Sequence, residues 1–488
     1  MSLITISNVT FAYDGSYDNV FEDVSFQIDT DWKLGFTGRN GRGKTTFLHL
    51  LLGKYEYSGS ISGRVNIEYF PFDVHDRTIN TLDVVTNINP DYQLWELERE
   101  LSILGVSEDV LYRPFDTLSN GEQTKILLAT LFLKENSFLL IDEPTNHLDS
   151  EAREIVGNYL KTKKGFILVS HDRAFLDNCI DHILSINKTD IEIQKGNFSS
   201  WYENKKMQDN YELAENQKLK KEIKRLDKAA KRTAVWSDKK EKSKNDDDVP
   251  DRGFVSHKAA KMMKRSKSLE ARRHDAIEEK SSLLKNIESS DLLQIKPRQY
   301  HSSRLVTFDK VSLSYGEKKV CDNVSFTIEQ GDRIALRGKN GSGKSSILKL
   351  ICGENLSFTG NFQRSSNLVI SYVSQDTSFL KGNLSDFAKE SGIDESQFKA
   401  ILRKMDFSRV QFEKDMRDFS GGQKKKVLIA RSLCESAHLY IWDEPLNFID
   451  VLSRIQIEEL LLSCNPTLLF VEHDKTFTET IATDTIYL

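Results

Sequence analysis

The sequence predicts an α/β protein in which one domain occurs twice in tandem, the copies being joined by a long antiparallel α-helical hairpin. A repeat predicts the duplication, because GFTGRNGRGKTTFLHLLLGKYEYSGSISG at 35–63 returns as ALRGKNGSGKSSILKLICGENLSFTGNF at 335–362. The hairpin is predicted from about a hundred intervening residues that show no strand pattern. We therefore expect a first domain at 1–200, a linker at 201–302 and a second domain at 303–488.

The elements expected within each copy alternate between strands and helices. In the first copy, alternation in ISNVTFAY and EDVSFQI predicts two edge strands. KLGFTG predicts a buried strand that ends in a glycine loop, and TTFLHLLLG predicts the helix after it. FLLID and FILVS are short apolar runs of the kind found in central parallel strands. Each copy is therefore expected to carry a parallel sheet with an antiparallel sheet added on one side.

The bulk sequence predicts a cytoplasmic protein. No window approaches the roughly 18 uninterrupted apolar residues of a membrane-spanning helix. The start, MSLITISNVTF, lacks the basic patch and apolar run of a secretory signal. The five cysteines form no CxxC pair, so they are interpreted as reduced thiols rather than metal ligands or disulfides.

The linker is basic on an acidic chain. Residues 218–273 hold 20 Lys+Arg and 9 Asp+Glu, a net charge of +11, whereas the whole chain carries −5. Such a limb usually binds polyanions. Two apolar seams predict its helical arms: Leu219, Ile223, Leu226, Ala230 and Thr233, then Met262, Leu269, Ala276 and Leu283. The turn KSKNDDDVPDRGF separates arms of about 35 residues, or about 50 Å, and the tip is expected at about 237–256. A solvated coiled coil is the alternative, and the Asp246–Asp248 triplet argues against tight RNA contact at that point.

GRNGRGKT at 38–45 and GKNGSGKS at 338–345 match the phosphate-loop pattern between a strand and a helix. Glycines let backbone N–H groups converge on phosphate oxygens, and the helix N-terminus favours negative charge. Lys44 and Lys344 are expected to reach the β- and γ-phosphates, while Thr45 and Ser345 are expected to bind Mg²⁺. The expected nucleotide contacts are Gly38, Asn40, Gly41, Gly43, Lys44, Thr45 and Thr46, and Gly338, Asn340, Gly341, Gly343, Lys344, Ser345 and Ser346.

Acidic residues end the apolar runs FLLIDE and LYIWDE. Asp142 and Asp443 are candidate Mg²⁺ ligands, and Glu143 and Glu444 are candidate general bases for the attacking water. An acidic strand cap is the alternative. His171 and His473 each close another apolar strand at matching positions, which favours a γ-phosphate contact over a structural role.

The segments LSNGEQ and FSGGQ resemble the signature of ATP-binding-cassette (ABC) ATPases. The resemblance implies that Ser119, Gly121 and Gln123 complete the site begun by Lys344, while Ser420, Gly422 and Gln423 complete the one begun by Lys44. It also implies two ATP molecules between the copies, with Tyr13 and Tyr315 stacked on adenine. For both tyrosines, ordinary packing is the alternative.

Three departures from the family pattern predict unequal sites. Phe72 occupies the position that Gln375 fills in the second copy, where the glutamine is a candidate catalytic residue and Mg²⁺ ligand. PLNFID replaces PTNHLD in the second copy, and Glu472 stands where the first copy has Ser170. The sequence does not indicate which site is slower.

Twin cassettes, a basic hairpin and no membrane domain resemble the ABC-F family, and most closely its Lsa/Vga-type antibiotic-resistance branch. Likeness to that branch rests on GRNGRGKTTF, LSNGEQTK, AHLYIWDEPLNFIDVLSR and LFVEHD, on the short segments before both signatures and on the lack of a basic tail. The resemblance implies a monomer whose two ATPase domains pair within the chain. By the same resemblance, the ATP-bound form is expected to occupy the exit site of the bacterial ribosome, displace peptidyl-site transfer RNA and contact large-subunit ribosomal RNA.

This resemblance further implies release of lincosamides, pleuromutilins or group A streptogramins. Lys242, Lys244, Arg252 and Phe254 are the candidate tip residues for that role. A translation factor with the same architecture but no drug role is the main alternative. The ATPase pair of a membrane exporter is the third, and it gives no use for a basic hairpin.

Overall fold

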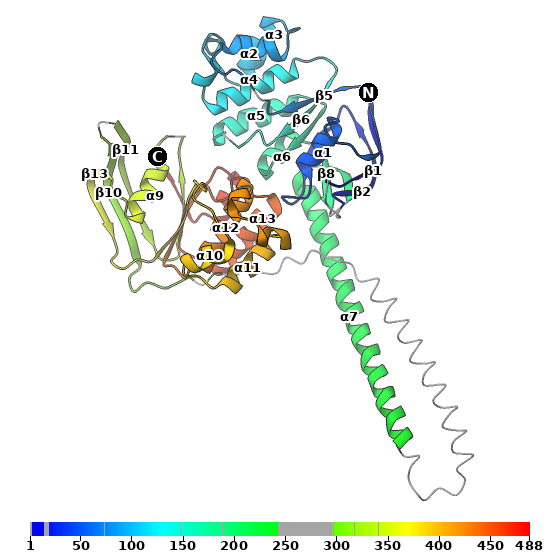
Figure 1. Ribbon diagram of the computed structural model, residues 1–488. Coiled ribbons are helices and arrows are strands. Elements are labelled where there is room, and N and C mark those ends of the chain that lie inside the picture. The colour runs from blue at the N-terminus through cyan, green and yellow to red at the C-terminus, as the bar shows by residue number, and fades with distance from the viewer. Residues whose placement is uncertain are drawn as a thin grey trace, which may run out of the picture. The chain divides into compact units, whose positions relative to one another are not determined.

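The computed structural model describes residues 2–13, 19–72, 74–146, 148–187, 190–242, 295, 297–316, 318–339 and 341–488 (Figure 1). The chain divides into two compact units, Met1–Ser199 together with Ser290–Leu488, and Ser200–Ser289. The first unit contains both copies of the repeated domain. Within the described ranges, no helix combines the length and apolar character needed to cross a membrane.

The first copy contains a parallel sheet, a smaller antiparallel sheet and the helices that flank them. Its strands are β1 (Leu3–Phe11), β2 (Phe21–Asp29), β3 (Lys33–Thr37), β4 (Ser58–Ser62), β5 (Asn66–Phe70), β6 (Ser137–Asp142), β7 (Phe166–Val169), β8 (His182–Asn187) and β9 (Asp190–Lys195). Its helices are α1 (Lys44–Leu51), α2 (Thr81–Ile88), α3 (Leu94–Ile103), η1 (Glu108–Tyr112), η2 (Phe115–Thr117), α4 (Asn120–Phe132), α5 (Ser150–Thr162) and α6 (Arg173–Cys179). Figure 1 shows α2, α3 and α4 gathered into one helical group.

The second copy repeats this order. Its strands are β10 (Arg304–Tyr315), β11 (Lys318–Glu329), β12 (Arg333–Arg337), β13 (Ser357–Arg364), β14 (Ile370–Val373), β15 (Leu439–Asp443), β16 (Leu468–Val471) and β17 (Asp484–Tyr487). Its helices are α9 (Lys344–Cys352), α10 (Leu384–Glu390), α11 (Glu395–Lys404), η4 (Arg409–Glu413), η5 (Met416–Asp418), α12 (Gly421–Cys434), α13 (Val451–Cys464) and α14 (Lys475–Ile481).

The parallel sheets place the phosphate loops beside the acidic strands. The strand order is β5-β6-β7-β3-β8-β9 in the first copy and β14-β15-β16-β12-β17 in the second. All neighbours are parallel except β8 and β9. One strand, β7 or β16, therefore separates the strand before each phosphate loop (β3 or β12) from the strand that ends in Asp142 or Asp443. Loops at the carboxyl ends of such strands form the ligand-binding edge of an α/β sheet.

The predicted α/β class with two tandem domains is confirmed, and one detail of the prediction is wrong. β1 was expected at a sheet edge, but the antiparallel sheet has the order β2-β1-β4, so β1 is its middle strand. The strand that covers β1 is β4, SGSIS, whose residues are exposed or half-buried. A strand with so few apolar residues gives little periodic signal, so the sequence pattern does not reveal it.

Helix α7 (Phe198–Lys242) forms the described part of the linker. It spans 45 residues, or roughly 70 Å at 1.5 Å per residue. No proline or glycine interrupts it, so nothing in the backbone breaks it before the predicted turn. It begins inside the predicted first domain and continues into the predicted tip. The second predicted arm, with most of the tip, lies outside the described residues.

The core of each copy lies between its two sheets and the helix after the phosphate loop. In the first copy Phe36 on β3 and Phe47 on α1 are buried with ring centroids 5.5 Å apart. In the second copy Ile347 and Leu348 on α9 are buried against the equivalent strands. Burial of large apolar side chains, each contributing about 1.5–3 kcal/mol, holds the helix against the strand from which the loop emerges.

Candidate active site

The phosphate loops depend on glycines with left-handed backbone conformations. φ is +81° at Gly41 and +91° at Gly43, and the equivalent Gly341 and Gly343 have +83° and +94°. A Cβ atom on Gly43 would lie 2.6 Å from Cγ1 of Val20, so a side chain at this position is excluded sterically as well. The two loops therefore share the same backbone conformation at these glycines; Asn340 lies outside the described residues.

The loop lysines lie in a ring of oxygen acceptors. Nζ of Lys44 donates to the carbonyl oxygen of Gly38 at 2.7 Å and lies 3.3 Å from Oδ1 of Asn40. Nζ of Lys344 donates to the carbonyl oxygens of Gly338 and Lys339 at 2.9 and 2.8 Å. Burial lowers the pKa of both lysines. A buried ammonium group at a helix N-terminus is suited to bind a polyphosphate, because the negative charge of the phosphates would balance its positive charge.

Oxygen ligands of the type that Mg²⁺ prefers meet beside each lysine. Oγ1 of Thr45 and the hydroxyl of Tyr69 each donate to Oδ2 of Asp142 at 3.1 Å. In the second copy, Oδ1 of Asp443 is buried and has no hydrogen-bond partner within the described residues, and Ser345 bonds to the same carboxyl group. Burial raises the pKa of both aspartates. A bound cation would satisfy these acceptors, so the residues fit a magnesium ion in each copy.

The glutamates that follow the acidic strands have a backbone conformation rare for side-chain-bearing residues. φ is +50° at Glu143 and +46° at Glu444, a strain on the order of 1–3 kcal/mol each. Pairing with the next strand maintains it, because their amide groups donate to the carbonyl oxygens of Val169 and Val471 at 2.9 and 3.0 Å. Local strain of this kind is typical of functional sites.

The side-chain surroundings of the two glutamates differ. Oε2 of Glu444 accepts hydrogen bonds from Nε2 of Gln375 at 2.8 Å and Nδ2 of Asn447 at 2.6 Å. His473 Nε2 is 3.6 Å from the other oxygen. Burial opposes ionisation of Glu444, but the contacts with His473 and Gln375 outweigh it, so its pKa lies below the ordinary value.

The carboxyl group of Glu143 has no described side-chain amide donor. Nε2 of His171 is 3.4 Å from its Oε1, an atom that is buried and has no hydrogen-bond partner within the described residues. Burial, together with the charge of Asp142, raises the pKa of Glu143 to about 8. Burial and the nearby Lys44 hold the pKa of His171 well below its ordinary value, so its imidazole is neutral.

Residues of both copies line one cavity of about 580 Å³. From the first copy it contains the phosphate loop with Lys44, the acidic pair Asp142 and Glu143, and His171. The opposite wall is formed by residues 420–422 and Phe448 of the second copy. The two walls touch where Nδ2 of Asn40 donates to the carbonyl oxygen of Phe448 at 2.6 Å. Residues far apart in the sequence, including Ser420 and Gly422, are thus brought to face Lys44.

Fewer contacts between the copies are described at the second nucleotide site, which contains Lys344. Nζ of Lys339, in the second phosphate loop, lies 3.6 Å from Oε2 of Glu151 on α5. The charge of Asp149 also acts on Lys344. The first turn of α4, with Ser119 and Gly121, follows the same local geometry as the first turn of α12.

Both signature helices begin with the same reciprocal cap. Ser119 Oγ accepts from the amide of Glu122 at 3.3 Å, and the carboxylate of Glu122 accepts from the amide of Ser119 at 2.8 Å. Ser420 and Gln423 repeat this pair. Glu122 is also the residue that aligns with Gln423 in the repeat, so Gln123 lies one residue further along the helix. The side-chain amide nitrogen of Gln123, Nε2, donates to the carbonyl oxygens of residues 115 and 118.

The candidate adenine-stacking tyrosines are partly exposed rather than buried. Tyr13 is 45% exposed and Tyr315 is 49% exposed. Their hydroxyl groups lie 2.6 Å from Oγ1 of Thr46 and 3.3 Å from Oγ of Ser346. Such exposure leaves the tyrosines available to a ligand beside the phosphate loop.

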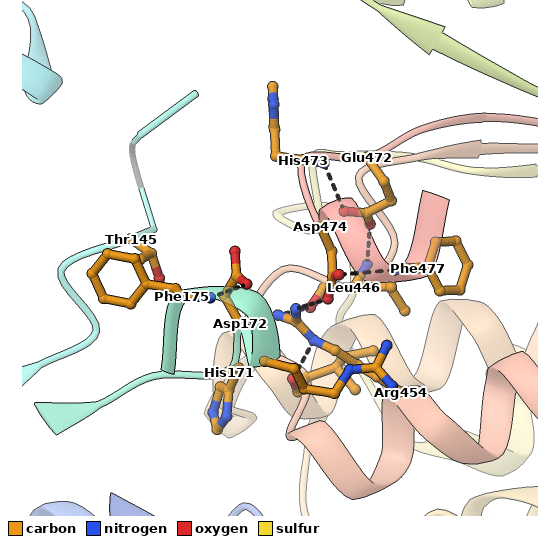
Figure 2. Close-up of polar contacts among 12 residues, drawn as sticks. Thr145, His171, Asp172, Phe175, Leu446, Arg454, Glu472, His473, Asp474 and Phe477 are labelled. Carbon is orange, nitrogen blue, oxygen red and sulfur yellow. Dashed lines mark hydrogen bonds and ion pairs between the residues drawn. The ribbon is translucent and has the colours of Figure 1, made fainter. Parts of the chain in front are cut away.

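Glu472 connects the second histidine loop to the acidic loop. Its carboxylate accepts from the amide of Leu446 at 2.7 Å and from the amide of His473 at 3.2 Å. Figure 2 shows the guanidinium of Arg454 beside Asp474, to which it donates at 2.9 Å; it also donates to the carbonyl oxygen of Leu446 at 3.0 Å. In the first copy the hydroxyl of Ser170 lies 3.3 Å from that of Thr145 instead. The substitution therefore replaces a contact between two hydroxyl groups with hydrogen bonds from two backbone amides.

Some residues predicted for the site lie outside the described structure, and others that contribute to the site were not predicted. Lys242 ends helix α7, and the other tip candidates, Lys244, Arg252 and Phe254, lie outside the described residues. Sequence reasoning missed Tyr69, Asn447 and Phe448 as site residues. For Asn447 a signal existed, since an asparagine recurs at the same position of both acidic loops.

Comparisons with known proteins agree with this geometry. The family model for ABC transporters matches residues 21–146 and 321–447, together more than half of the chain. The ribosome protection protein VmlR of Bacillus subtilis is 28% identical over 487 residues, covering 98% of this chain and 85% of that protein. The ATP-binding protein Uup of Caulobacter vibrioides is 28% identical over 486 residues, covering 96% and 74%.

Solved structures share the fold at low sequence identity. The archaeal ribosome recycling factor aABCE1, in a complex with the ribosomal stalk protein aP1, gives a TM-score of 0.64 at 17% identity, covering 98% of this chain and 87% of that one. An RNase-L inhibitor gives 0.62 at 17% identity, covering 99% and 87%.

Proposed function

Because the chain belongs to the ABC transporter family of ATPases and hydrolyses ATP, we propose that it is a ribosome-protection factor driven by two ATP sites. Its relatives are consistent with the ABC-F membership that the sequence predicts. In this proposal ATP closes the two copies around both sites, the closed form binds the ribosome, and hydrolysis releases it. The cavity in which Lys44 of one copy faces Ser420 and Gly422 of the other is the observation that carries the proposal.

The residues of each site divide the chemistry among them. Lys44 and Lys344 hold the β- and γ-phosphates, and the signature helices present their N-terminal amide groups to the γ-phosphate from the opposite copy. Magnesium, when bound by Thr45 and Asp142 or by Ser345, Asp443 and Gln375, offsets phosphate charge. Tyr13 and Tyr315 bind the adenine.

Hydrolysis needs an oriented water and an acceptor for its proton. Glu143 or Glu444 accepts that proton while the water oxygen attacks the γ-phosphorus. The bond from the γ-phosphorus to the bridging oxygen breaks, so ADP and phosphate leave. His171 and His473 contact the γ-phosphate. Loss of this phosphate removes the link between the copies, which then separate.

The ribosome is the proposed partner because of the relative and the linker. VmlR is named a ribosome protection protein and aligns over 98% of this chain, linker included. The basic linker, with net charge +11 over residues 218–273, suits an RNA-rich partner. In the cytoplasm the chain, as a monomer, occupies the exit site, displaces peptidyl-site transfer RNA and brings Lys242, Lys244, Arg252 and Phe254 toward the peptidyl-transferase centre. Lincosamides, pleuromutilins or group A streptogramins are the drugs released.

Trapping the closed state tests the ribosome proposal directly. The double variant Glu143→Gln/Glu444→Gln, incubated with ATP and bacterial ribosomes, is expected to sediment with them, whereas the wild type leaves after hydrolysis. The surface variant Glu108→Gln/Glu354→Gln, with both residues exposed, serves as the control. Recovery of the trapped variant in ribosome-free fractions alone would contradict the proposal.

A second experiment separates drug protection from a general translation role. Expression in a sensitive bacterium is expected to raise the inhibitory concentration of at least one of the three drug classes. Unchanged inhibitory concentrations together with ribosome binding would instead identify a translation factor without a drug role. Capture of membrane proteins in place of ribosomes would favour the ATPase pair of an exporter.

A further inference from the structure

We infer that the two nucleotide sites have different tasks, the second hydrolysing ATP and the first retaining its nucleotide and keeping the copies together. The second site is the one built on Lys344 and Glu444, and the first is built on Lys44 and Glu143. This inference rests on the two-site ATPase part of the proposed function and is independent of the ribosome.

Glu444 is held in one orientation by neighbouring amide groups. Gln375 Nε2 and Asn447 Nδ2 lie 2.8 and 2.6 Å from the same carboxylate oxygen. His473 lies near the other oxygen, at 3.6 Å. Two donors on one oxygen leave the other available to accept a proton from water. Gln375 and Asn447 are therefore positioning residues for the second site.

The first site lacks the amide that Gln375 provides. Phe72 stands at that position, and its ring lies 5.8 Å from Nζ of Lys134, a cation–π contact. A phenyl ring can neither donate a hydrogen bond to Glu143 nor bind magnesium. The described contacts of the Glu143 carboxyl group are with His171, whose Nε2 lies 3.4 Å from Oε1 and whose backbone amide bonds to the group; no side-chain amide is described on it. A carboxylate less fixed in orientation orients water less well.

Contacts between the copies are concentrated beside the first site. Nη2 of Arg42, in the first phosphate loop, lies 3.5 Å from Oδ1 of Asp406 in the second copy. Arg173, two residues after His171, forms a bidentate pair with Glu458 on α13, one arm being 3.1 Å. The side chains of this pair are 12% and 7% exposed. A bidentate, mostly buried pair of this kind is geometrically specific.

The repeat allows the equivalent positions beside the second site to be compared. Arg42 and Asp406 correspond to Ser342 and Gly105, and Arg173 and Glu458 correspond to Lys475 and Gly157. Neither set can form an ion pair, because each contains a glycine. Lys339 and Glu151 do pair across the second site at 3.6 Å, but their side chains are 84% and 70% exposed. An exposed pair of this kind contributes little.

These two asymmetries favour the same division of tasks. The site with the better-oriented glutamate has the weaker contacts between the copies, and the site with the stronger contacts has the poorly oriented glutamate. Hydrolysis at the second site would thus open that edge first, while the first site acts as the hinge.

Single-site variants of the purified full-length chain, without ribosomes, test the assignment. Glu444→Gln is expected to lower ATP turnover by more than about tenfold, within the range of general-base contributions. Glu143→Gln is expected to lower it by less than about twofold if the first site contributes little turnover. Equal losses, or a larger loss for Glu143→Gln, would overturn the inference. Absence of turnover in the wild type would instead refute the ATPase on which it rests.

Exchanging the distinguishing side chain provides a second test with a readout other than turnover. The protein is loaded with labelled ATP and Mg²⁺, allowed one round of hydrolysis, and freed of unbound nucleotide by gel filtration. The wild type is expected to retain ATP and ADP in similar amounts, and Phe72→Gln to retain mostly ADP. Gln375→Phe is expected to retain mostly ATP. An unchanged ATP-to-ADP ratio in both variants would overturn the inference.

The variants include their own controls for folding. Glu108→Gln, on the exposed surface of η1, is expected to match the wild type in both assays. Phe72→Gln/Gln375→Phe exchanges the two environments and is expected to exchange the effects of Glu143→Gln and Glu444→Gln. A double variant that folds but keeps the wild-type order of those effects would assign the asymmetry to other residues and contradict the role of Gln375.

Discussion

Replacing Gly422 with alanine should weaken the contact between the two copies at the first site. A Cβ atom at Gly422 would lie 2.4 Å from the carbonyl oxygen of Phe448 and 2.9 Å from Nδ2 of Asn40. The hydrogen bond between those two groups, 2.6 Å long, would have to break or shift. The equivalent Gly121 provides a comparison, since among the described residues a Cβ there would meet only Leu148 within 4 Å, at an ordinary 3.7 Å; His147, the counterpart of Phe448, lies outside those residues.

The expected magnitude follows from two opposing effects. Both glycines are the second residue of a helix, α12 or α4, and neither has a positive φ. Alanine should therefore stabilise each helix by up to about 1 kcal/mol. At Gly422 the overlap with backbone costs roughly 1–3 kcal/mol. The net expectation is a loss of about 1–2 kcal/mol for Gly422→Ala and a slight gain for Gly121→Ala.

Hydrogen exchange measured by mass spectrometry can locate the effect. Peptides covering residues 38–45 and 445–450 should exchange faster in Gly422→Ala and should be unchanged in Gly121→Ala. Thermal unfolding of both variants shows whether either fold is lost. Wild-type protection of both peptides in Gly422→Ala would refute the reasoning, because it would mean that the loop containing Phe448 does not contact the first phosphate loop.

Three further predictions concern buried charges. Lys426→Met should destabilise the second copy by about 3–5 kcal/mol, because it leaves the fully buried Asp450 without the ammonium 2.9 Å away. Urea unfolding, followed by the fluorescence of Trp442, measures this loss of stability. Burial opposes ionisation of Asp450, but Lys426 outweighs it and lowers the pKa, so the stabilisation should be complete above pH about 4 and be lost as the pH falls below. Trp442 unfolding in Lys426→Met should accordingly be less acid-sensitive than in the wild type. Arg173→Ala and Glu458→Ala should show a coupling energy of about 0.5–3 kcal/mol in a double-mutant cycle of hydrogen exchange at α6, and strict additivity would argue against the pair.

The parts of the fold and site that sequence predicts are those with local signals. Apolar runs identified β3, β6 and β7, and glycine spacing identified the phosphate loops, because strand burial and left-handed φ impose strong local requirements. The exposed strand β4 has no such requirement, so β1 was assigned to an edge. The caps of the two signature helices are made by Glu122 and Gln423, residues that the repeat itself aligns.

Contacts across long sequence separations were not predictable from one chain. The pairs Arg42–Asp406 and Arg173–Glu458 join residues several hundred positions apart, and no local pattern marks either member. The facing of Ser420 and Lys44 was expected only through family resemblance. The contact between the side-chain amide of Gln375 and Glu444 likewise depends on two loops meeting at one sheet edge.

The left-handed backbone of Glu143 sets the stability of the fold against the chemistry of the first site at a single residue. Glycine at that position would relieve a strain on the order of 1–3 kcal/mol and would also remove a buried carboxyl oxygen that lacks a hydrogen-bond partner in the described structure. A chain with glycine in place of this glutamate would therefore have a larger free energy of unfolding. A strained glutamate occurs in both copies, as Glu143 and Glu444. An engineered, non-hydrolysing form of the protein could therefore gain thermal stability by replacing both residues.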